Sequence, residues 1–310
     1  MKVAIFGSTS NIAADAINHF SNINIELDLY SRNEDHANQL ILKTDGKKVN
    51  YLHYRMFNSI VKYDVIINFI GLGCPKKIKN AADELVNIAN FYDTMILDYL
   101  TSNSKCKYIF ISSGVVYGED FLEPIPENGK TISDHLANPK LSSYAISKIS
   151  CEKRHRDLQK NAIVDLRIFS YFNSKYDPSS QFFMSQICNA IRDNEVLIVS
   201  ADKMVRDYIH PIDFCTLIDV IIATEPLNTV IDCYSNKPIE KIALLEAMKN
   251  EFGLRYIVKD QTPNQSIYTN KTNYYSLLSN AKKIGYKPNY SSLEGLISEC
   301  KKIFPANPEK

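Results

Sequence analysis

The sequence has 310 residues, of which 45% are hydrophobic and 23% are charged, and its net charge at pH 7 is +1. This length suits one large α/β domain or two smaller ones, and this composition is typical of a soluble globular protein. A net charge close to zero gives no electrostatic basis for binding nucleic acid or an anionic membrane, so neither partner is expected.

Cysteine usage and the apolar runs indicate the compartment. Seven cysteines are scattered singly, without a CxxC pair and without clustered histidines. This pattern is typical of reduced thiols, so we expect a cytoplasmic protein with no disulfide and no metal site. The amino-terminal run MKVAIFGSTSN is soon interrupted by polar residues, which favours a buried strand over a signal peptide. The sequence contains no apolar run long enough to cross a membrane.

The first half of the chain alternates short apolar runs with longer amphipathic segments. Strands are predicted for the apolar runs at residues 2–6, 25–30, 64–70, 107–112 and 162–169. Helices are predicted for the amphipathic segments at residues 10–20, 80–103 and 143–161. Strands that alternate with helices of this length indicate βαβ units, which predicts an α/β fold with a Rossmann-like, doubly wound parallel sheet.

After about residue 170 the pattern changes. Prolines separate shorter predicted helices, among them residues 181–192 and 240–252. We therefore expect the parallel-sheet domain to span residues 1–168, with later segments around 203–225 returning to it. Residues 169–310 are expected to form mainly a second, smaller domain packed on the sheet.

A glycine turn follows the first predicted strand. Gly7 begins the segment GSTSNIA, which leads into a helix. A glycine there lets the chain turn tightly, and the helix N-terminus presents free N–H groups to a pyrophosphate. Ser10 and Ala13, both small, stand where the usual fingerprint has its other two glycines. The motif favours a dinucleotide site, and a simple turn between strand and helix is the alternative.

A second cofactor signal lies at the end of the second strand, in LYSRN. NAD sites usually carry an acidic residue about 20 residues after the glycine turn, where it binds the ribose hydroxyls. Here Ser31 and Arg32 occupy that place, and Asp28 comes too early in the strand to reach the ribose. A hydroxyl and a guanidinium suit a 2′-phosphate, so the pair favours NADP(H) over NAD(H). The alternative is an arginine of a surface loop with no ligand.

Tyr144 and Lys148 lie one helical turn apart in the segment LSSYAISKISCEK. The spacing alone is not distinctive, because tyrosine followed by a basic residue four positions later recurs elsewhere in the chain, as in Tyr171 and Lys175. The context is distinctive, because the pair follows a strand that ends in ISSGVVYG, at the sheet edge where ligands bind in open α/β folds. A lysine ammonium beside a tyrosine favours the phenolate and so allows proton exchange at neutral pH. The charged segment EKRHRDLQK (152–160) is expected to form a solvated helix face.

Further motifs follow in a fixed order along the chain. They are NFYDT at 90–94, SGVVYG at 113–118, PKLSSY at 139–144 leading to Lys148, VRDYIHPID at 205–213 and NAKKIGYKPNYSSLEGL at 280–296. Together these motifs resemble the extended short-chain dehydrogenase/reductase family, in its branch of NAD(P)-dependent nucleotide-sugar epimerases, dehydratases and reductases. The resemblance spans about residues 1–300. Asp93 departs from it, because the family has glycine at that place.

The resemblance implies a catalytic set of Ser113, Tyr144 and Lys148. It implies cofactor contacts in the first domain from a larger set: Gly7, Thr9, Ser10, Asn11, Ile12, Ser31, Arg32, Phe69, Ile70, Gly71, Asn90, Tyr144 and Lys148. Substrate contacts are implied for Ser113, for Ser170 and for Arg206, which in the family contacts the nucleotide. The implied substrate is a nucleotide-sugar, the implied assembly is a homodimer, and the second domain is implied to bind the substrate.

Three functions remain open. Dehydratases of the family carry an Asp-Glu pair directly after the catalytic hydroxyl, whereas this chain has Gly114 and Val115, so dehydration is not expected. A 4-epimerase with tightly bound NAD and an NADPH-dependent 4-ketosugar reductase both remain, and Ser31 with Arg32 favours the reductase. A non-catalytic NADP-binding regulator is the third possibility, which the intact catalytic set disfavours.

Overall fold

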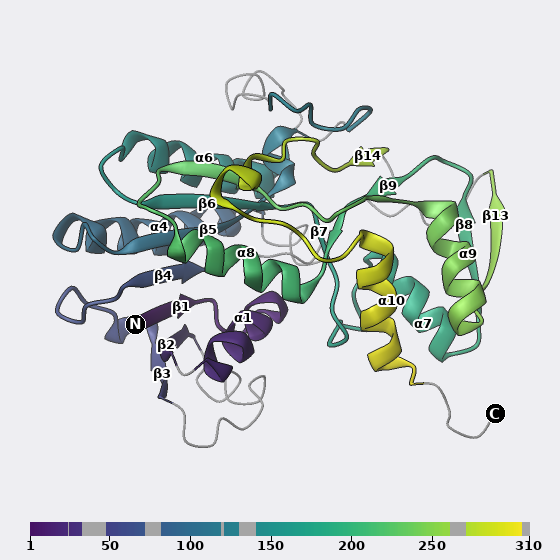
Figure 1. Cartoon of the computed structure of the whole chain (residues 1–310), viewed down its shortest axis with the longest axis horizontal. Helices are drawn as coiled ribbons and strands as arrows, with labels where there is room; N and C mark the ends of the chain where they lie inside the picture. Colours follow the sequence, from purple (N-terminus) through teal and green to yellow (C-terminus); the bar gives the residue numbers. More distant parts are fainter. Residues whose placement is uncertain are drawn as a thin grey trace.

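A seven-stranded parallel sheet forms the larger part of the molecule (Figure 1). The computed structural model describes residues 1–23, 25–32, 48–71, 82–118, 121–129, 141–260 and 271–305. In spatial order the strands are β11 (Thr229–Asp232), β6 (Ile163–Ile168), β5 (Lys107–Ser113), β4 (Val65–Asn68), β1 (Lys2–Phe6), β2 (Glu26–Ser31) and β3 (Val49–His53). This order is that of a doubly wound sheet, so the predicted Rossmann-like fold class is confirmed.

The central strands are buried on both faces and carry mostly apolar side chains. VIIN of β4 and IVDLRI of β6 are buried at every position, as in a parallel sheet covered on both sides. The predicted strands at 2–6, 25–30, 64–70, 107–112 and 162–169 coincide with β1, β2, β4, β5 and β6 to within two residues at each end. The edge strands β3 and β11 were not predicted, because β3 has no fully buried position and β11 is fully buried at only two of its four positions.

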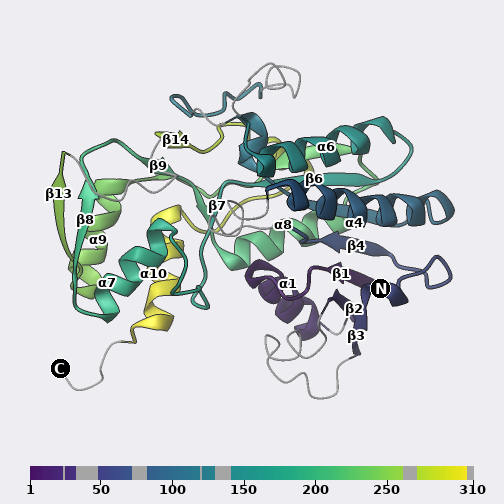
Figure 2. The same cartoon turned by 180° about the vertical axis from the view of Figure 1, so that it is seen from behind.

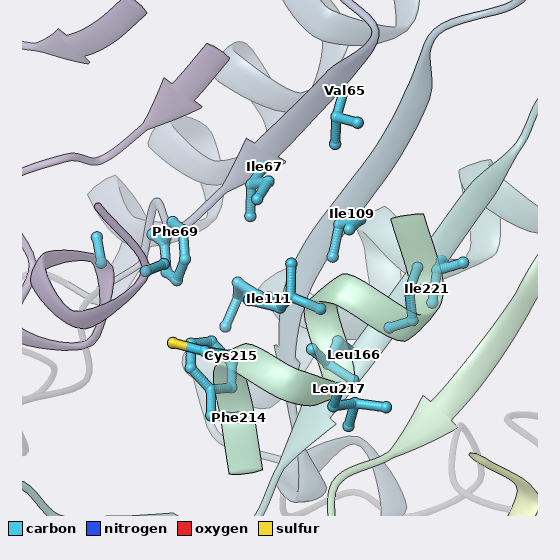
Figure 3. Close-up of a cluster of buried hydrophobic side chains, with 14 of the residues drawn as sticks. Val65, Ile67, Phe69, Ile109, Ile111, Leu166, Phe214, Cys215, Leu217 and Ile221 are labelled. Atoms are coloured by element: carbon cyan, nitrogen blue, oxygen red, sulfur yellow. The ribbon is translucent and has the colours of Figure 1, made fainter. Parts of the chain in front are cut away.

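Two pairs of helices cover the sheet (Figures 1 and 2). Helices α1 (Asn11–Asn22) and α8 (Pro211–Ala223) pack on one face, and α4 (Ala82–Ser102) and α6 (Ser143–Asp157) pack on the other. Figure 3 shows Leu217 and Ile221 of α8 beside Ile109 and Leu166 of the sheet. No helix in the described ranges is long and apolar enough to cross a membrane.

A smaller unit lies beyond one edge of the sheet domain, at the right of Figure 1. It contains α7 (Phe183–Arg192), α9 (Lys241–Phe252), α10 (Ser292–Ile303) and the parallel pair β8 (Val196–Ser200) and β13 (Arg255–Lys259). Its core is separate from those of the sheet domain and is built from residues of these elements, such as Ile187, Leu245 and Leu296.

Short strands connect the two parts. Strand β6 leads directly into β7 (Ser170–Tyr171), which pairs with β10 (Tyr208–Ile209). Strand β9 (Val205–Arg206) lies between β12 (Ile239–Glu240) and β14 (Asn273–Tyr274). The 3-10 turns are η1 (Tyr54–Met56), η2 (Gly114–Tyr117) and η3 (Asn280–Ile284). Six cysteines are described, all buried and free, while Cys74 lies outside the described residues.

Candidate active site

The turn after β1 requires glycine at its first position. Gly7 has φ +73°, and a Cβ there would lie 2.9 Å from the carbonyl carbon of Phe69 and 3.0 Å from the nitrogen of Ile70. The turn therefore packs directly against the end of β4, where Phe69 and Ile70 are both buried. Ser10 caps α1, since its hydroxyl accepts the N–H of Ala13 at 3.2 Å. Serine at the second fingerprint position thus contributes a cap that glycine lacks.

The rest of the glycine turn fits a dinucleotide pyrophosphate. Thr9 and Ile12 are half-buried, and Asn11 is the first residue of α1, so the helix N-terminus opens onto the turn. The Asn11 side-chain amide donates to Asn173 at 2.9 Å, which ties this turn to the chain just after β7. Gly71, which follows β4, lies close to Lys148: a Cβ at Gly71 would be 3.1 Å from Lys148 Nζ.

The end of β2 carries Ser31, which is buried, and Arg32, which is exposed. Burial raises the pKa of Tyr54, and the positive charge of Arg32 acts in the opposite direction. The Tyr54 hydroxyl accepts the N–H of Gly7 at 3.0 Å. Asp28 is held inside the sheet by Tyr63, whose hydroxyl donates to it at 2.6 Å.

Helix α6 positions the tyrosine and the lysine. Ser142 caps the helix by accepting the N–H of Ala145 at 3.3 Å, which places Tyr144 in the first turn and Lys148 one turn later. Lys148 Nζ donates to the carbonyl of Ile111 at 2.6 Å and to that of Ile70 at 3.3 Å, at the ends of β5 and β4. The lysine is only 3% exposed, and burial lowers its pKa to about 8.

Ser113 ends β5 and meets the Tyr144 hydroxyl. Burial raises the pKa of Tyr144, and its hydrogen bond with Ser113 lowers it. Gly114 is required next to Ser113, because a Cβ there would lie 2.5 Å from the ring of Phe169. The structure therefore brings Ser113, Tyr144 and Lys148 together at the carboxyl edge of the sheet, from two elements that are packed on each other.

A second tyrosine hydroxyl also reaches Ser113. The Tyr274 hydroxyl lies 3.2 Å from Ser113 Oγ, although the two residues are 161 positions apart. Sequence reasoning missed Tyr274, because it lies in the stretch between the motifs at 205–213 and 280–296, where no motif is recognised. The only available signal was its place shortly before the motif at 280–296, and that signal does not specify a direction for the side chain.

The strand pair β9 and β14 brings cations beside Tyr274. Arg206 is paired with Tyr274 in register, and its guanidinium lies 5.8 Å from the centre of the tyrosine ring. Arg206 is buried, which lowers its pKa, and it donates to the carbonyl of Val205 at 2.8 Å. Lys271 is buried as well, with Nζ 4.7 Å from the centre of the Tyr274 ring. Ser170 lies half-buried in β7, where the two parts of the molecule meet.

Asp93 lies in a buried ionic network between α4 and α6. It accepts hydrogen bonds from Tyr108 at 2.8 Å and from Arg154 at 2.6 Å, and it lies 2.8 Å from His155 Nε2. The other ring nitrogen of His155 lies 2.6 Å from Asp165. Burial lowers the pKa of His155, but the two carboxylates raise it to about 9.

The expectation that residues 152–160 form a solvated face is wrong for Glu152 and His155, whereas Lys153, Asp157, Gln159 and Lys160 are exposed. Glu152 and His155 are fully buried, because carboxylate, guanidinium and imidazole partners satisfy them inside the protein. Asn90, on the same side of α4, is half-buried, and its side-chain oxygen accepts from Ser150 of α6 at 3.3 Å. In this structure Asn90 therefore contributes to helix packing, and its predicted cofactor contact stays a prediction.

One groove is not lined by Ser113, Tyr144 or Lys148, although Asn90 is among its lining residues. It has a volume of about 690 Å³ and runs along α4 beside Phe57 and Ser59, with Phe91 and Met95 in its wall. The chemistry of the catalytic set is instead enclosed by apolar packing, with Ala145 and Ile149 of α6 against Phe169. Proton exchange between Tyr144 and a bound oxygen is the reaction that these side chains can support.

Comparisons with known proteins agree with this geometry. The family model described as the NAD dependent epimerase/dehydratase family matches residues 5–231. Comparison with curated protein sequences finds no match. Among solved structures, UDP-N-acetylglucosamine 4-epimerase from Methanobrevibacter ruminantium, in complex with UDP-N-acetylmuramic acid, has 19% identity and a TM-score of 0.80, with 98% of this chain and 97% of that chain covered.

Two further solved structures are similar over nearly their whole length. UDP-glucose 4-epimerase from Stenotrophomonas maltophila, with bound NAD and formylated UDP-arabinopyranose, has 14% identity and a TM-score of 0.79, with 98% of this chain and 97% of that chain covered. UDP-glucose 4-epimerase from Thermus thermophilus, in complex with NAD, has 15% identity and a TM-score of 0.74, with coverage of 99% and 100%. At these identities the likeness concerns the fold.

Proposed function

Since this chain belongs to the NAD dependent epimerase/dehydratase family, we propose that it transfers hydride between a nicotinamide cofactor and a nucleotide-sugar, as an NADPH-dependent 4-ketosugar reductase. The observation that carries the proposal is the meeting of Ser113, Tyr144 and Lys148 beside the end of β4. Proton transfer groups at this place have no use in a protein that only senses the cofactor.

The three side chains have separate tasks in this reaction. Tyr144 gives its hydroxyl proton to the substrate oxygen as the carbonyl becomes an alcohol. Ser113 holds the same oxygen through a hydrogen bond and stabilises its developing negative charge. Lys148 stabilises the phenolate that Tyr144 becomes, and as an ammonium it would also hold the cofactor ribose. The bound cofactor supplies the hydride.

The cofactor preference rests on the end of β2. Ser31 and Arg32 stand where a carboxylate would bind ribose hydroxyls. The carboxylate of Asp28 forms an ion pair with Lys2 of the neighbouring strand β1, at 3.0 Å. Arg32 is exposed at the end of β2, and its positive charge acts on the Tyr54 hydroxyl, which contacts Gly7. A charge-assisted contact between arginine and phosphate stabilises binding by about 1.5–3 kcal/mol, which corresponds to roughly ten- to a hundredfold in affinity.

The substrate class rests on the cations beside the catalytic set. Arg206 and Lys271 are buried near Tyr274, where a diphosphate bound to a sugar would require positive charge. Solved structures of the same fold hold UDP-sugars and related UDP compounds. Gly114 and Val115 carry no titratable side chain, so a dehydratase has no acid-base pair at that place.

A 4-epimerase is the second candidate. The observation that favours it is that the similar solved structures are 4-epimerases, several of them with NAD. An epimerase retains its cofactor through the cycle, whereas a reductase must exchange NADP⁺ for NADPH at every turnover. We further propose a homodimer in the cytoplasm, which the exposed apolar side chain of Phe91 on α4 and the buried free thiols support.

The two candidates differ in cofactor retention and in products. One portion of the purified protein is denatured, and the nucleotide that it releases is identified. With a second, native portion, the oxidation of NADPH and of NADH is followed in the presence of a panel of UDP-linked 4-ketosugars. We expect little retained cofactor, faster oxidation of NADPH than of NADH, and loss of that preference in Arg32→Ala. Tightly bound NAD, with interconversion of two UDP-sugar epimers and no added cofactor, would establish the epimerase instead.

A further inference from the structure

The Ser113 hydroxyl has three hydrogen-bonding neighbours, and it cannot donate a proton to more than one of them. It accepts the N–H of Val115 at 3.4 Å, and it also contacts the hydroxyls of Tyr144 and Tyr274. A serine hydroxyl has one proton to donate and two lone pairs to accept with. A backbone N–H can only donate, so Val115 occupies one lone pair. One lone pair and one proton remain for the two tyrosines.

Two arrangements are therefore possible, and they differ in reactivity. If Ser113 donates to Tyr274, its proton points away from Tyr144 and from the substrate oxygen beside it. If Tyr274 donates to Ser113, the serine proton is left to point toward Tyr144 and that oxygen. Only the second arrangement lets Ser113 stabilise negative charge on the substrate.

The surroundings of Tyr274 favour the second arrangement. Lys271 Nζ lies 4.7 Å and the Arg206 guanidinium 5.8 Å from the centre of the Tyr274 ring. Positive charge near a phenol favours negative charge on its oxygen, which makes the phenol a stronger donor. A phenol is also intrinsically more acidic than an aliphatic hydroxyl, so Tyr274 is the better donor of the two.

The ring of Tyr274 is also held firmly. It is 8% exposed, meets Phe121 edge-on at 4.7 Å between ring centres, and lies 5.3 Å from the ring of Phe169. Its backbone is paired with Arg206 in the β9 and β14 ladder. The hydroxyl is thus placed by packing from both parts of the molecule, which is what a positioning group requires.

We propose that Tyr274 is a positioning residue for the reaction: its hydroxyl donates to Ser113 Oγ and thereby directs the serine proton toward Tyr144 and the substrate oxygen. The inference rests on the proposed function. It also links the two units, because the segment that carries Arg206 and Tyr274 fixes the orientation of a hydroxyl on β5.

Tyr274→Phe tests the proposal, because it removes the hydroxyl and keeps the ring packing. With NADPH and the UDP-linked 4-ketosugar that the panel identifies, we expect kcat to fall about tenfold, the size of one hydrogen bond, and KM to change less than about threefold. Tyr275→Phe, at the next position, is the matched control and is expected to leave kcat unchanged. A loss confined to KM, or no loss of kcat, would overturn the proposal.

A double-mutant cycle separates positioning from a structural effect. In the Ser113→Ala background the serine proton is gone, so Tyr274→Phe should lower kcat no further. An undiminished tenfold loss in that background would mean that Tyr274 acts on the substrate or on the fold, not through Ser113.

A titration tests the same inference without any substrate. The Tyr144 phenol is followed by NMR in protein with isotope-labelled tyrosine rings, saturated with NADPH and assigned by its absence in Tyr144→Phe. Because Ser113 then donates less fully to the phenol oxygen, Tyr274→Phe should raise the Tyr144 pKa, and Tyr275→Phe should not. An unchanged or lowered pKa would refute the inference. A raised pKa in a protein inactive on every nucleotide-sugar would uphold it and refute the proposed function alone.

Discussion

At the scale of single residues, the environment of Lys148 determines the pH at which this proposed catalytic lysine is charged. Its ammonium donates to two main-chain carbonyls and lies 4.4 Å from the centre of the Phe110 ring. Burial lowers its pKa to about 8, and nearby carboxylates such as Glu152 and Asp93 oppose that decrease. The group therefore changes charge close to physiological pH, which suits the role proposed for it beside the Tyr144 phenol.

Removal of the Tyr144 hydroxyl should abolish most of the chemistry. Tyr144→Phe is expected to lower kcat by at least about 100-fold, the usual contribution of a general acid, while cofactor affinity stays within about twofold. Initial rates and a cofactor titration measure both. Tyr275→Phe is the control. Near-normal turnover in Tyr144→Phe would remove this residue from the mechanism.

Lys148 should act on cofactor binding as well as on rate. Lys148→Ala is expected to weaken NADPH affinity and kcat together, whereas Lys175→Ala, an exposed lysine, should change neither. Because the charged ammonium binds the ribose more strongly than the amine does, wild-type affinity should decrease as pH rises through about 8. Isothermal titration at several pH values measures this. A pH dependence that persists in Lys148→Ala would assign it to another group.

At the scale of elements, α4 and α6 are joined by a buried ionic network in addition to apolar packing. His155 lies between Asp93 and Asp165, and its pKa is raised to about 9. The ordinary value is about 6.5, so the folded protein binds this proton more tightly by roughly 3 kcal/mol. The contribution is complete below about pH 6.5 and is lost as pH rises through about 9.

Asp93→Asn should expose this contribution. Since one carboxylate of a buried ion pair is removed, we expect the free energy of unfolding to fall by about 3 kcal/mol at neutral pH. The fall should be smaller near pH 10, where His155 is neutral in the folded state as well. Urea unfolding at both pH values measures the difference. Asp98→Asn, an exposed carboxylate of the same helix, is the control. An equal loss at both pH values would show that charge on His155 is not involved.

Some elements could be predicted from the sequence alone and others could not. Apolar runs predicted β1, β2, β4, β5 and β6, because strands buried on both faces carry a continuous signal. The edge strand β3 lacks that signal, because it is only partly buried. The polarity of residues 152–160 predicted a solvated face, whereas Glu152 and His155 of this segment lie on the buried face of α6, in an ionic core.

The same limit applies to the site. Ser113, Tyr144 and Lys148 could be located through the ordered motifs that resemble the family, since the spacing of tyrosine and lysine alone recurs elsewhere in the chain. Tyr274 could not be located, since its approach to Ser113 depends on how the second unit docks on the sheet. The sequence identified Asp93 as a departure from the family, but its partners become visible only when the two helices are packed together.

At the scale of the whole molecule, α4 presents apolar surface to solvent. Phe91 is 62% exposed and lines the groove along this helix. If a second copy covers this face, Phe91→Lys should convert a dimer into a monomer at micromolar concentration. Ile257→Lys, at an exposed apolar position of β13 in the smaller unit, should leave the dimer intact. Sedimentation velocity distinguishes the two, and a monomeric wild-type protein would contradict the proposed homodimer.

The central claim is that Tyr144 protonates a nucleotide-linked 4-ketosugar as NADPH is consumed. It is tested most directly by a single-turnover experiment, in which the protein is mixed with NADPH and a UDP-linked 4-ketosugar and the loss of NADPH absorbance is followed alongside the sugar product. The account predicts one alcohol product formed per NADPH oxidised in the wild-type protein, and a rate at least about 100-fold lower in Tyr144→Phe. NADPH that stays reduced while the protein binds both ligands, or equal rates in the two proteins, would contradict it.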